Sequence, residues 1–159
     1  MSRYLLLTVV AGGVIIFDQV SKYAVQHMMV LYDYIEVIPG FFGLTYIPNP
    51  GAAFGLFGSA AASVRSLFLI GISITALAIL FFMYARLTEK SILIHISIGM
   101  IIGGAVGNLI DRIRFGGVTD FIDFKVWPVF NVADSSVTVG VVILAVYIFL
   151  MAGRARKQV

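Results

Sequence analysis

The sequence predicts an integral membrane protein that is mainly α-helical and has four transmembrane helices. The mean hydropathy is +1.03, 60% of the 159 residues are hydrophobic and only 12% are charged, which is far from the composition of a soluble domain. Four apolar runs are long enough, or nearly so, for the roughly 20 residues that a helix needs to cross a bilayer. They are Tyr4 to about Tyr23, Val64–Tyr84, Ser91–Ile110 and Ser135–Met151.

The first run is interrupted by Asp18, too early for a full span, so we expect this helix to carry Asp18 and Lys22 in its outer turns. A cleaved signal peptide is the competing interpretation, but no small-x-small cleavage site occurs before Asp18. In D-Q-V-S-K the acid precedes the base by four residues, which favours an ion pair on one helix face. Ser21 and Lys22 point about 100° apart on a helix, which is poor geometry for a serine–lysine dyad.

An outer segment of residues 24–63 separates the first two helices. Its prolines and glycines favour turns, and residues 34–37 and 43–47 favour short strands. We therefore expect a small, partly extended structure on the membrane surface. Within it, N-P-G-A-A-F at residues 49–54 supplies turn geometry and exposed backbone groups. Taken alone, this motif indicates a turn rather than a site.

The third helix carries G-x-x-x-G-G-x-x-G-N-x-x-D-R and follows the second after the short link 85–90, so these helices should be antiparallel neighbours. A stripe of small residues allows another helix to pack closely. The stripe consists of Gly99, Gly103 and Gly107. Asp111 continues this stripe, whereas Asn108 and Arg112 lie one turn apart on the adjacent one. At this outer end of the helix an Arg fork could bind a carboxylate, a phosphate or peptide carbonyls. Structural bracing through Asp111 and Arg112 is an equal alternative.

Residues 116–136 contain Asp120, Asp123 and Asp134 at the edge of the last apolar run. Carboxylates are costly at a membrane, so they are functional candidates. Locally, Asp134 could simply be the N-cap of the last helix. However, the chain has no cysteine and only two histidines, which excludes thiol nucleophiles and leaves little for a histidine-based site. The remaining hydrolytic option is a pair of carboxylates that share a proton.

The distribution of charge suggests an orientation. With the amino terminus inside, six basic residues lie in the cytoplasm and five outside, a weak margin that the R-A-R-K cluster near the carboxy terminus supports. Seven of the eight acids then lie outside, all but Glu89. We therefore expect both termini in the cytoplasm and the chemistry at the outer face. The net charge of +3 is small and is not gathered in a patch, so nucleic acid is not an expected partner.

Five ordered motifs together identify a family. D-Q-V-S-K, N-x-G-A-A-F, G-G-A-x-G-N-x-x-D-R, V-x-D-F and F-N-x-A-D-S resemble those of the bacterial lipoprotein signal peptidases, the type II signal peptidases among the aspartic membrane peptidases. The resemblance covers about residues 15–140. It implies four membrane helices with a small extracytoplasmic β-cradle and a short interfacial helix, in one domain of the bacterial cytoplasmic membrane. It also implies cleavage of diacylglyceryl-modified prolipoproteins just before the lipidated cysteine, without a metal or cofactor.

The resemblance assigns expected roles to ten residues. Asp120 and Asp134 match the catalytic pair. The positions that resemble substrate-contacting or supporting residues are Asn49, Gly51, Asn108, Arg112 and Asn131, and those that look structural are Asp18, Lys22 and Asp111. Pro50 occupies a variable position and should stiffen the loop.

Two other classes remain as alternatives. One is a small proton-coupled transporter component, although no carboxylate occurs in the middle of the second, third or fourth helix, where a proton relay would need one. The other is a lipid-binding scaffold without catalysis. For the peptidase, the expected partners are lipidated precursors and membrane lipids, and we expect a monomer.

Overall fold

The computed structural model describes residues 2–51, 62–88 and 91–156. These residues form four helices and a three-stranded sheet. In chain order the elements are α1 (Arg3–Met28), β1 (Tyr34–Ile38), β2 (Phe42–Asn49), α2 (Ala62–Arg86), α3 (Ile92–Phe115), β3 (Val118–Asp123) and α4 (Val132–Arg156). All four helices contain stretches long and apolar enough to cross a membrane. The predicted fold class, four such helices with a small sheet, is confirmed.

Helix α3 is central and packs against each of the other three helices. The glycine stripe explains how closely they approach, because a Cβ on Gly103 would lie 2.8 Å from the Ala11 backbone oxygen of α1. On the adjacent face, a Cβ on Gly104 would collide with the Ala133 backbone oxygen of α4. The small residues therefore bring three helices together around the middle of α3.

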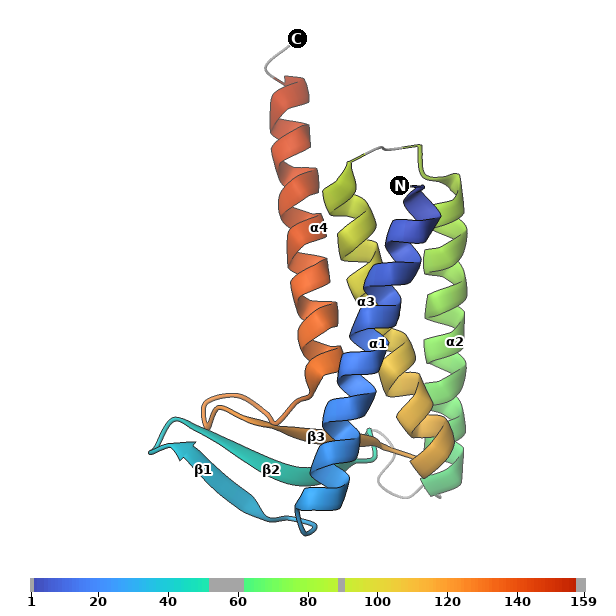
Figure 1. The fold of residues 1–159 in the computed structure, drawn as a ribbon. Helices are drawn as coiled ribbons and strands as arrows, with labels where there is room; N and C mark the ends of the chain where they lie inside the picture. Colours follow the sequence, from blue (N-terminus) through green and yellow to red (C-terminus); the bar gives the residue numbers. More distant parts are fainter. Residues whose placement is uncertain (1, 52–61, 89–90, 157–159) are drawn as a thin grey trace.

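The sheet lies at one end of the helices, while α1 begins and α4 ends at the opposite end (Figure 1). Its strands are antiparallel in the order β1-β2-β3. The first two strands match the predicted extended residues, and their turn contains Gly40 at φ 68°. Strand β3 was not expected from the residues themselves. It is largely buried, and it places Asp120 between the sheet and the helices.

The helices differ from the expected spans mainly at the sheet end, although α4 also ends later than expected, at Arg156 rather than Met151. Helix α1 continues to Met28, α3 continues to Phe115, and α4 begins at Val132 rather than Ser135. Polar residues in these extra turns have partners in neighbouring elements, so hydropathy alone does not mark where the helices end. No further helix occurs among the described residues, and the expected interfacial helix stays a prediction. Residues Ala52–Phe54, Glu89, Lys90 and Lys157 lie outside the described residues.

Candidate active site

Asp120 lies in β3 and is only 3% exposed. Its carboxylate accepts two amide hydrogen bonds, one at Oδ2 from Asn49 Nδ2 at 2.8 Å and one at Oδ1 from Asn131 Nδ2 at 2.7 Å. The sheet register explains the first bond. Asp120 pairs with Ile47 and Val118 pairs with Asn49, so Asn49 is a diagonal neighbour on the same face. The sheet thus holds one end of a polar network against the helices.

The orientation of the Asn49 side chain is fixed by the turn that follows β2. The Gly51 backbone N–H donates to Asn49 Oδ1 at 2.8 Å, which leaves Nδ2 to face Asp120. Gly51 has φ 75°, a left-handed conformation that favours glycine, and a Cβ there would collide with the Leu69 side chain. Residues 49–51 of the motif therefore form a turn, as predicted, and this turn also orients an amide toward a carboxylate.

Asp134 lies in the first turn of α4. The helix starts earlier than hydropathy suggests because Asn131 precedes it as the N-cap. The Asp134 backbone N–H donates to Asn131 Oδ1 at 3.0 Å, and the Asn131 backbone N–H donates to Asp134 Oδ2 at 3.4 Å. This reciprocal pair is a capping box, with Asp134 as the third residue of the helix rather than the N-cap that the sequence suggested. The arrangement fixes the Asp134 carboxylate at a positive helix end.

Two buried asparagines connect the aspartates. Asn131 Nδ2, which donates to Asp120, also lies 3.2 Å from Asn108 Oδ1, and Asn108 Nδ2 donates to Asp134 Oδ1 at 2.8 Å. Lys22 Nζ donates to Asn108 Oδ1 at 2.9 Å. Because an ammonium group can only donate, this bond fixes the Asn108 amide with its Nδ2 toward Asp134. Both aspartates are thus held by amides whose orientations are themselves set by other groups.

A buried ion cluster lies behind these asparagines. Lys22 Nζ is 2.9 Å from Asp18 Oδ2 and 3.2 Å from Asp111 Oδ2, and all three side chains are at most 1% exposed. The predicted pair between Asp18 and Lys22 is therefore present, but Asp111 from α3 joins it. A buried charge needs partners of this kind, because an unpaired one would be very costly to desolvate.

The two acids of this cluster also hold the backbone beside the two site aspartates. Asp18 Oδ1 accepts the backbone N–H of Ala133 at 2.9 Å, and Asp111 Oδ2 accepts that of Thr119 at 3.0 Å. Ala133 immediately precedes Asp134 in the chain, and Thr119 immediately precedes Asp120. Lys22 pairs with both acids, and the acids in turn fix the backbone at Ala133 and Thr119.

Gln19 also belongs to this cluster, although its position in the sequence does not by itself predict this. Its Nε2 lies 3.1 Å from Asp18 Oδ2, 3.0 Å from Asp111 Oδ1 and 3.2 Å from the Gly107 backbone oxygen. The signal was present, because Gln19 lies inside D-Q-V-S-K. However, adjacent helix positions point in different directions, and only the fold shows that Gln19 reaches α3.

Arg112 and Asp123 occupy different surroundings. Arg112 lies on α3, where its positive charge interacts with the carboxylates of Asp134 and Asp120.

Asp123 lies outside the network, where it accepts the backbone N–H of Lys125 at 2.8 Å and pairs with its ammonium at 3.0 Å. The Lys125 backbone N–H is the main cause that lowers the pKa of Asp123. Asp123 is therefore a partly buried carboxylate whose partner, Lys125, lies outside the network.

The pKa of Asp120 is raised from its ordinary value of 3.8 to about 6. Burial is the main cause, and the negative charge of Asp134 adds to it. The hydrogen bonds from Asn49 and Asn131 and the charge of Lys22 act in the opposite direction. Asp120 can therefore hold a proton close to neutral pH, as one member of an acid–base pair must.

Two hollows meet at Asp134. One, of about 350 Å³, lies among α2, α3 and α4, where Asn108, Arg112 and Thr138 also line it. The other, of about 330 Å³, lies beneath the β3–α4 connection, where Trp127 contributes to its wall. An extended chain lying across Asp134 would have space on both sides. Among the described residues, no group of three His, Asp or Glu side chains could hold a metal ion.

The structure thus brings the predicted site residues into one connected region. Comparison with known proteins shows which family the chain resembles. Residues 10–150 match the family described as signal peptidase (SPase) II. A lipoprotein signal peptidase of Desulforapulum autotrophicum is 42% identical over 89% of this chain and 90% of its own length. One of Caldanaerobacter subterraneus subsp. tengcongensis is 44% identical over 93% and 98%.

Two solved structures are similar to this one in fold. A bacterial membrane enzyme determined by the in meso method at 2.3 Å superposes with a TM-score of 0.83 at 34% identity, covering 93% of this chain and 90% of the other. Another, determined at 1.9 Å, gives a TM-score of 0.81 at 35% identity over 89% and 91%. The family match at residues 10–150 includes the sheet and most of the four helices, and the chain belongs to the signal peptidase II family.

Proposed function

We propose that this protein is an aspartic endopeptidase that removes the signal peptide from diacylglyceryl-modified prolipoproteins, with Asp120 and Asp134 as its catalytic pair. The family is one of peptide hydrolases, and the relatives described above are named lipoprotein signal peptidases. The observation that carries the aspartic assignment is the bridge through Asn131, which donates to Asp120 and forms a capping box with Asp134. The hollows that meet at Asp134 provide room for a peptide.

The reaction is hydrolysis of the peptide bond just before the lipidated cysteine. Asp120 is buried and carries the proton that the pair shares, and Asp134, in the first turn of α4, takes the role of the base. The base removes a proton from water as the water attacks the scissile carbonyl, and the acid polarises the carbonyl oxygen. A proton then passes to the leaving amine as the peptide bond breaks. Water supplies the groups added to the two products, so no covalent intermediate with the enzyme forms.

The surrounding amides and Arg112 serve this reaction in different ways. Asn49, Asn108 and Asn131 position the carboxylates, as their hydrogen bonds indicate. Arg112 lines the hollow that reaches Asp134, where its fork can bind carbonyl oxygens of the substrate peptide. Gly51 acts through the turn that aims Asn49.

The same proposal includes an orientation in the bacterial cytoplasmic membrane. Helix α1 begins and α4 ends at the end of the bundle opposite to the sheet, and we place that end in the cytoplasm (Figure 1). The substrate's acyl chains can then stay among lipid tails while its peptide reaches the sheet end, where water is available. The family assignment does not support the transporter alternative.

The test is cleavage of a purified lipidated precursor, scored by release of its signal peptide. Asp120→Asn and Asp134→Asn should each abolish release while the protein stays folded. Asp123→Asn is the matched control, because this carboxylate lies in the same strand as Asp120 but outside the network, and it should retain substantial activity. Near-normal turnover by either of the first two variants would refute the catalytic pair. Binding of the precursor without cleavage by the wild type would instead favour a lipid-binding scaffold.

A further inference from the structure

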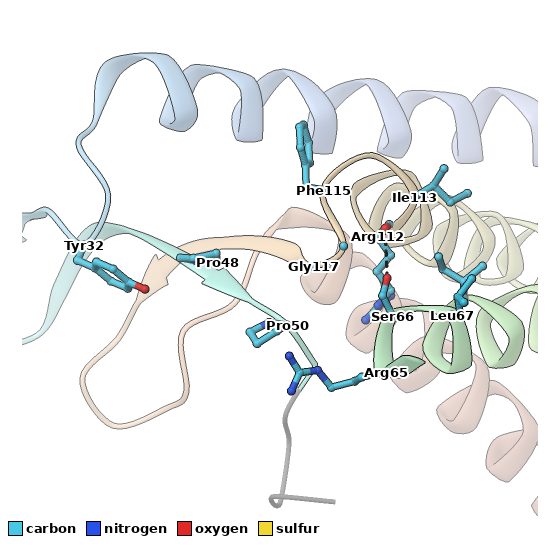
Figure 2. Close-up of a pocket in the computed structure, with 12 residues that line it drawn as sticks. Tyr32, Pro48, Pro50, Arg65, Ser66, Leu67, Arg112, Ile113, Phe115 and Gly117 are labelled. Carbon is cyan, nitrogen blue, oxygen red and sulfur yellow. Dashed lines mark hydrogen bonds between the residues drawn. The ribbon is translucent and has the colours of Figure 1, made fainter. Parts of the chain in front are cut away.

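A third hollow, separate from the two at Asp134, has a volume of about 700 Å³ (Figure 2). It lies where the start of α2, the end of α3 and the end of β2 meet. Arg65 and Arg112 contribute its positive charge, and Leu67, Ile70 and Ile113 contribute apolar walls. The hollow therefore combines cations with a hydrophobic surface, which is the combination that an anionic amphiphile needs.

Arg65 has no acidic partner among the residues that the structure describes. Its Nε atom is buried without a hydrogen-bond partner among the residues that the structure describes, and no ion pair to Arg65 occurs among them. The lining contains no carboxylate. The sequence contains no Asp or Glu at residues 52–61 either, and Glu89 follows α2 at its far end. A half-buried guanidinium without a counter-ion favours an anion from outside the chain.

The position of the Arg65 guanidinium relative to the membrane indicates which kind of anion it binds. Figure 2 shows Arg65 extending from the start of α2 toward Pro50 at the end of β2. Leu67 and Ile113, which line the same hollow, are 68% and 63% exposed on helices that can cross a membrane. Arg65 thus borders a lipid-facing surface at the level where a helix leaves the apolar layer. Basic pockets between transmembrane helices are known to bind the anionic headgroups of lipids, a chemistry that does not depend on the leaflet.

We propose that this hollow binds an anionic phospholipid of the leaflet on the sheet side. The lipid phosphate pairs with the Arg65 guanidinium, and its acyl chains lie over Leu67, Ile70 and Ile113. This site does not depend on the proposed catalysis, since Arg112 is its single residue in common with the hollow at Asp134. A bound lipid here would form part of the wall beside the active site.

The experiment measures lipid binding by native mass spectrometry on the full chain in delipidated detergent micelles. The probes are phosphatidylglycerol, phosphatidylcholine with the same chains, and inorganic phosphate. The wild type should prefer phosphatidylglycerol roughly fivefold, the effect expected of one Arg near an anionic headgroup. Arg65→Gln should remove this preference. Arg114→Gln should keep it, because Arg114 is an exposed cation at the same end of α3 but outside the lining.

Thermal unfolding first establishes that each variant is folded. If Arg65→Gln does not fold, Arg65→Lys replaces it in the test. A lysine keeps the positive charge but lacks the planar guanidinium, so it should weaken the preference for phosphatidylglycerol roughly two- to threefold. Equal binding of the two lipids to the wild type, or equal losses in Arg65→Gln and Arg114→Gln, would overturn the site. Equally tight binding of inorganic phosphate, or displacement of the lipid by an acidic peptide, would overturn the assignment to a phospholipid.

Discussion

The raised pKa of Asp120 makes folding stability depend on pH in a direction opposite to that of most carboxylates. The folded protein holds the Asp120 proton up to about pH 6, whereas the unfolded chain releases it near the ordinary value of 3.8. Between these values the folded state binds more protons, so the free energy of unfolding falls as pH rises. At about 1.4 kcal/mol for each pH unit between the two pKa values, the loss is about 3 kcal/mol.

Asp120→Asn removes this titration. The wild type should lose unfolding free energy between pH 4 and pH 7, and Asp120→Asn should reduce that loss by about 2.4 kcal/mol, because part of the total of about 3 kcal/mol falls outside this pH range. The absolute stability of the variant is a poorer measure, because Asn49 and Asn131 both present N–H groups to position 120 and one would lose its acceptor, at roughly 1–3 kcal/mol. The suitable assay is reversible unfolding by sodium dodecyl sulfate in mixed micelles at each pH.

The control is Asp123→Asn, because the pKa of Asp123 is lowered and its contribution to stability is lost as pH falls. This variant should not remove the loss of stability between pH 4 and pH 7. An Asp120→Asn profile that parallels the wild type over this range would refute the reasoning. The same proton should govern catalysis, so kcat/KM for precursor cleavage should decline on the alkaline side with an apparent pKa near 6.

Two further substitutions test the supports of the site. Lys22→Met would leave Asp18 and Asp111 buried without their cation. It should lower the unfolding free energy in mixed micelles by about 3–5 kcal/mol. A loss below about 1 kcal/mol would contradict the structural role of the cluster. Gly104→Ala places a methyl group against the α4 backbone and should cost about 1–3 kcal/mol and reduce cleavage. Gly71→Ala, which meets open space, should do neither, and equal effects of the two substitutions would argue against close packing of α3 and α4.

Much of the fold could be predicted because hydropathy and length act locally. Four runs of apolar residues are sufficient to indicate four helices, and the density of Pro and Gly indicates an extended outer segment. The start of α4 is harder to predict from the sequence, although N-x-x-D from Asn131 to Asp134 is a local capping pattern. Hydropathy favours Ser135 as the start because the continuous apolar run begins beyond Asp134.

The connections within the site could not be predicted from the residues alone. The bond from the Ala133 backbone to Asp18 joins positions 115 residues apart, and it exists because α3 brings α1 and α4 together. Likewise, Asn49 reaches Asp120 through the register of two strands, one of which had no clear signal. The resemblance to a family named the residues, whereas only the fold shows which atoms hold them.

The buried cluster around Lys22 also bears on how the chain enters the membrane. Asp18 and Lys22 lie four residues apart in one helix, so they can neutralise each other as soon as α1 has formed. Asp111 is synthesised almost ninety residues later and meets an ammonium group that is already in place. The Ala133 backbone N–H arrives last, with α4. Each acid therefore enters after, or together with, the cation that it needs, and the order of charges along the chain suits synthesis from the amino terminus.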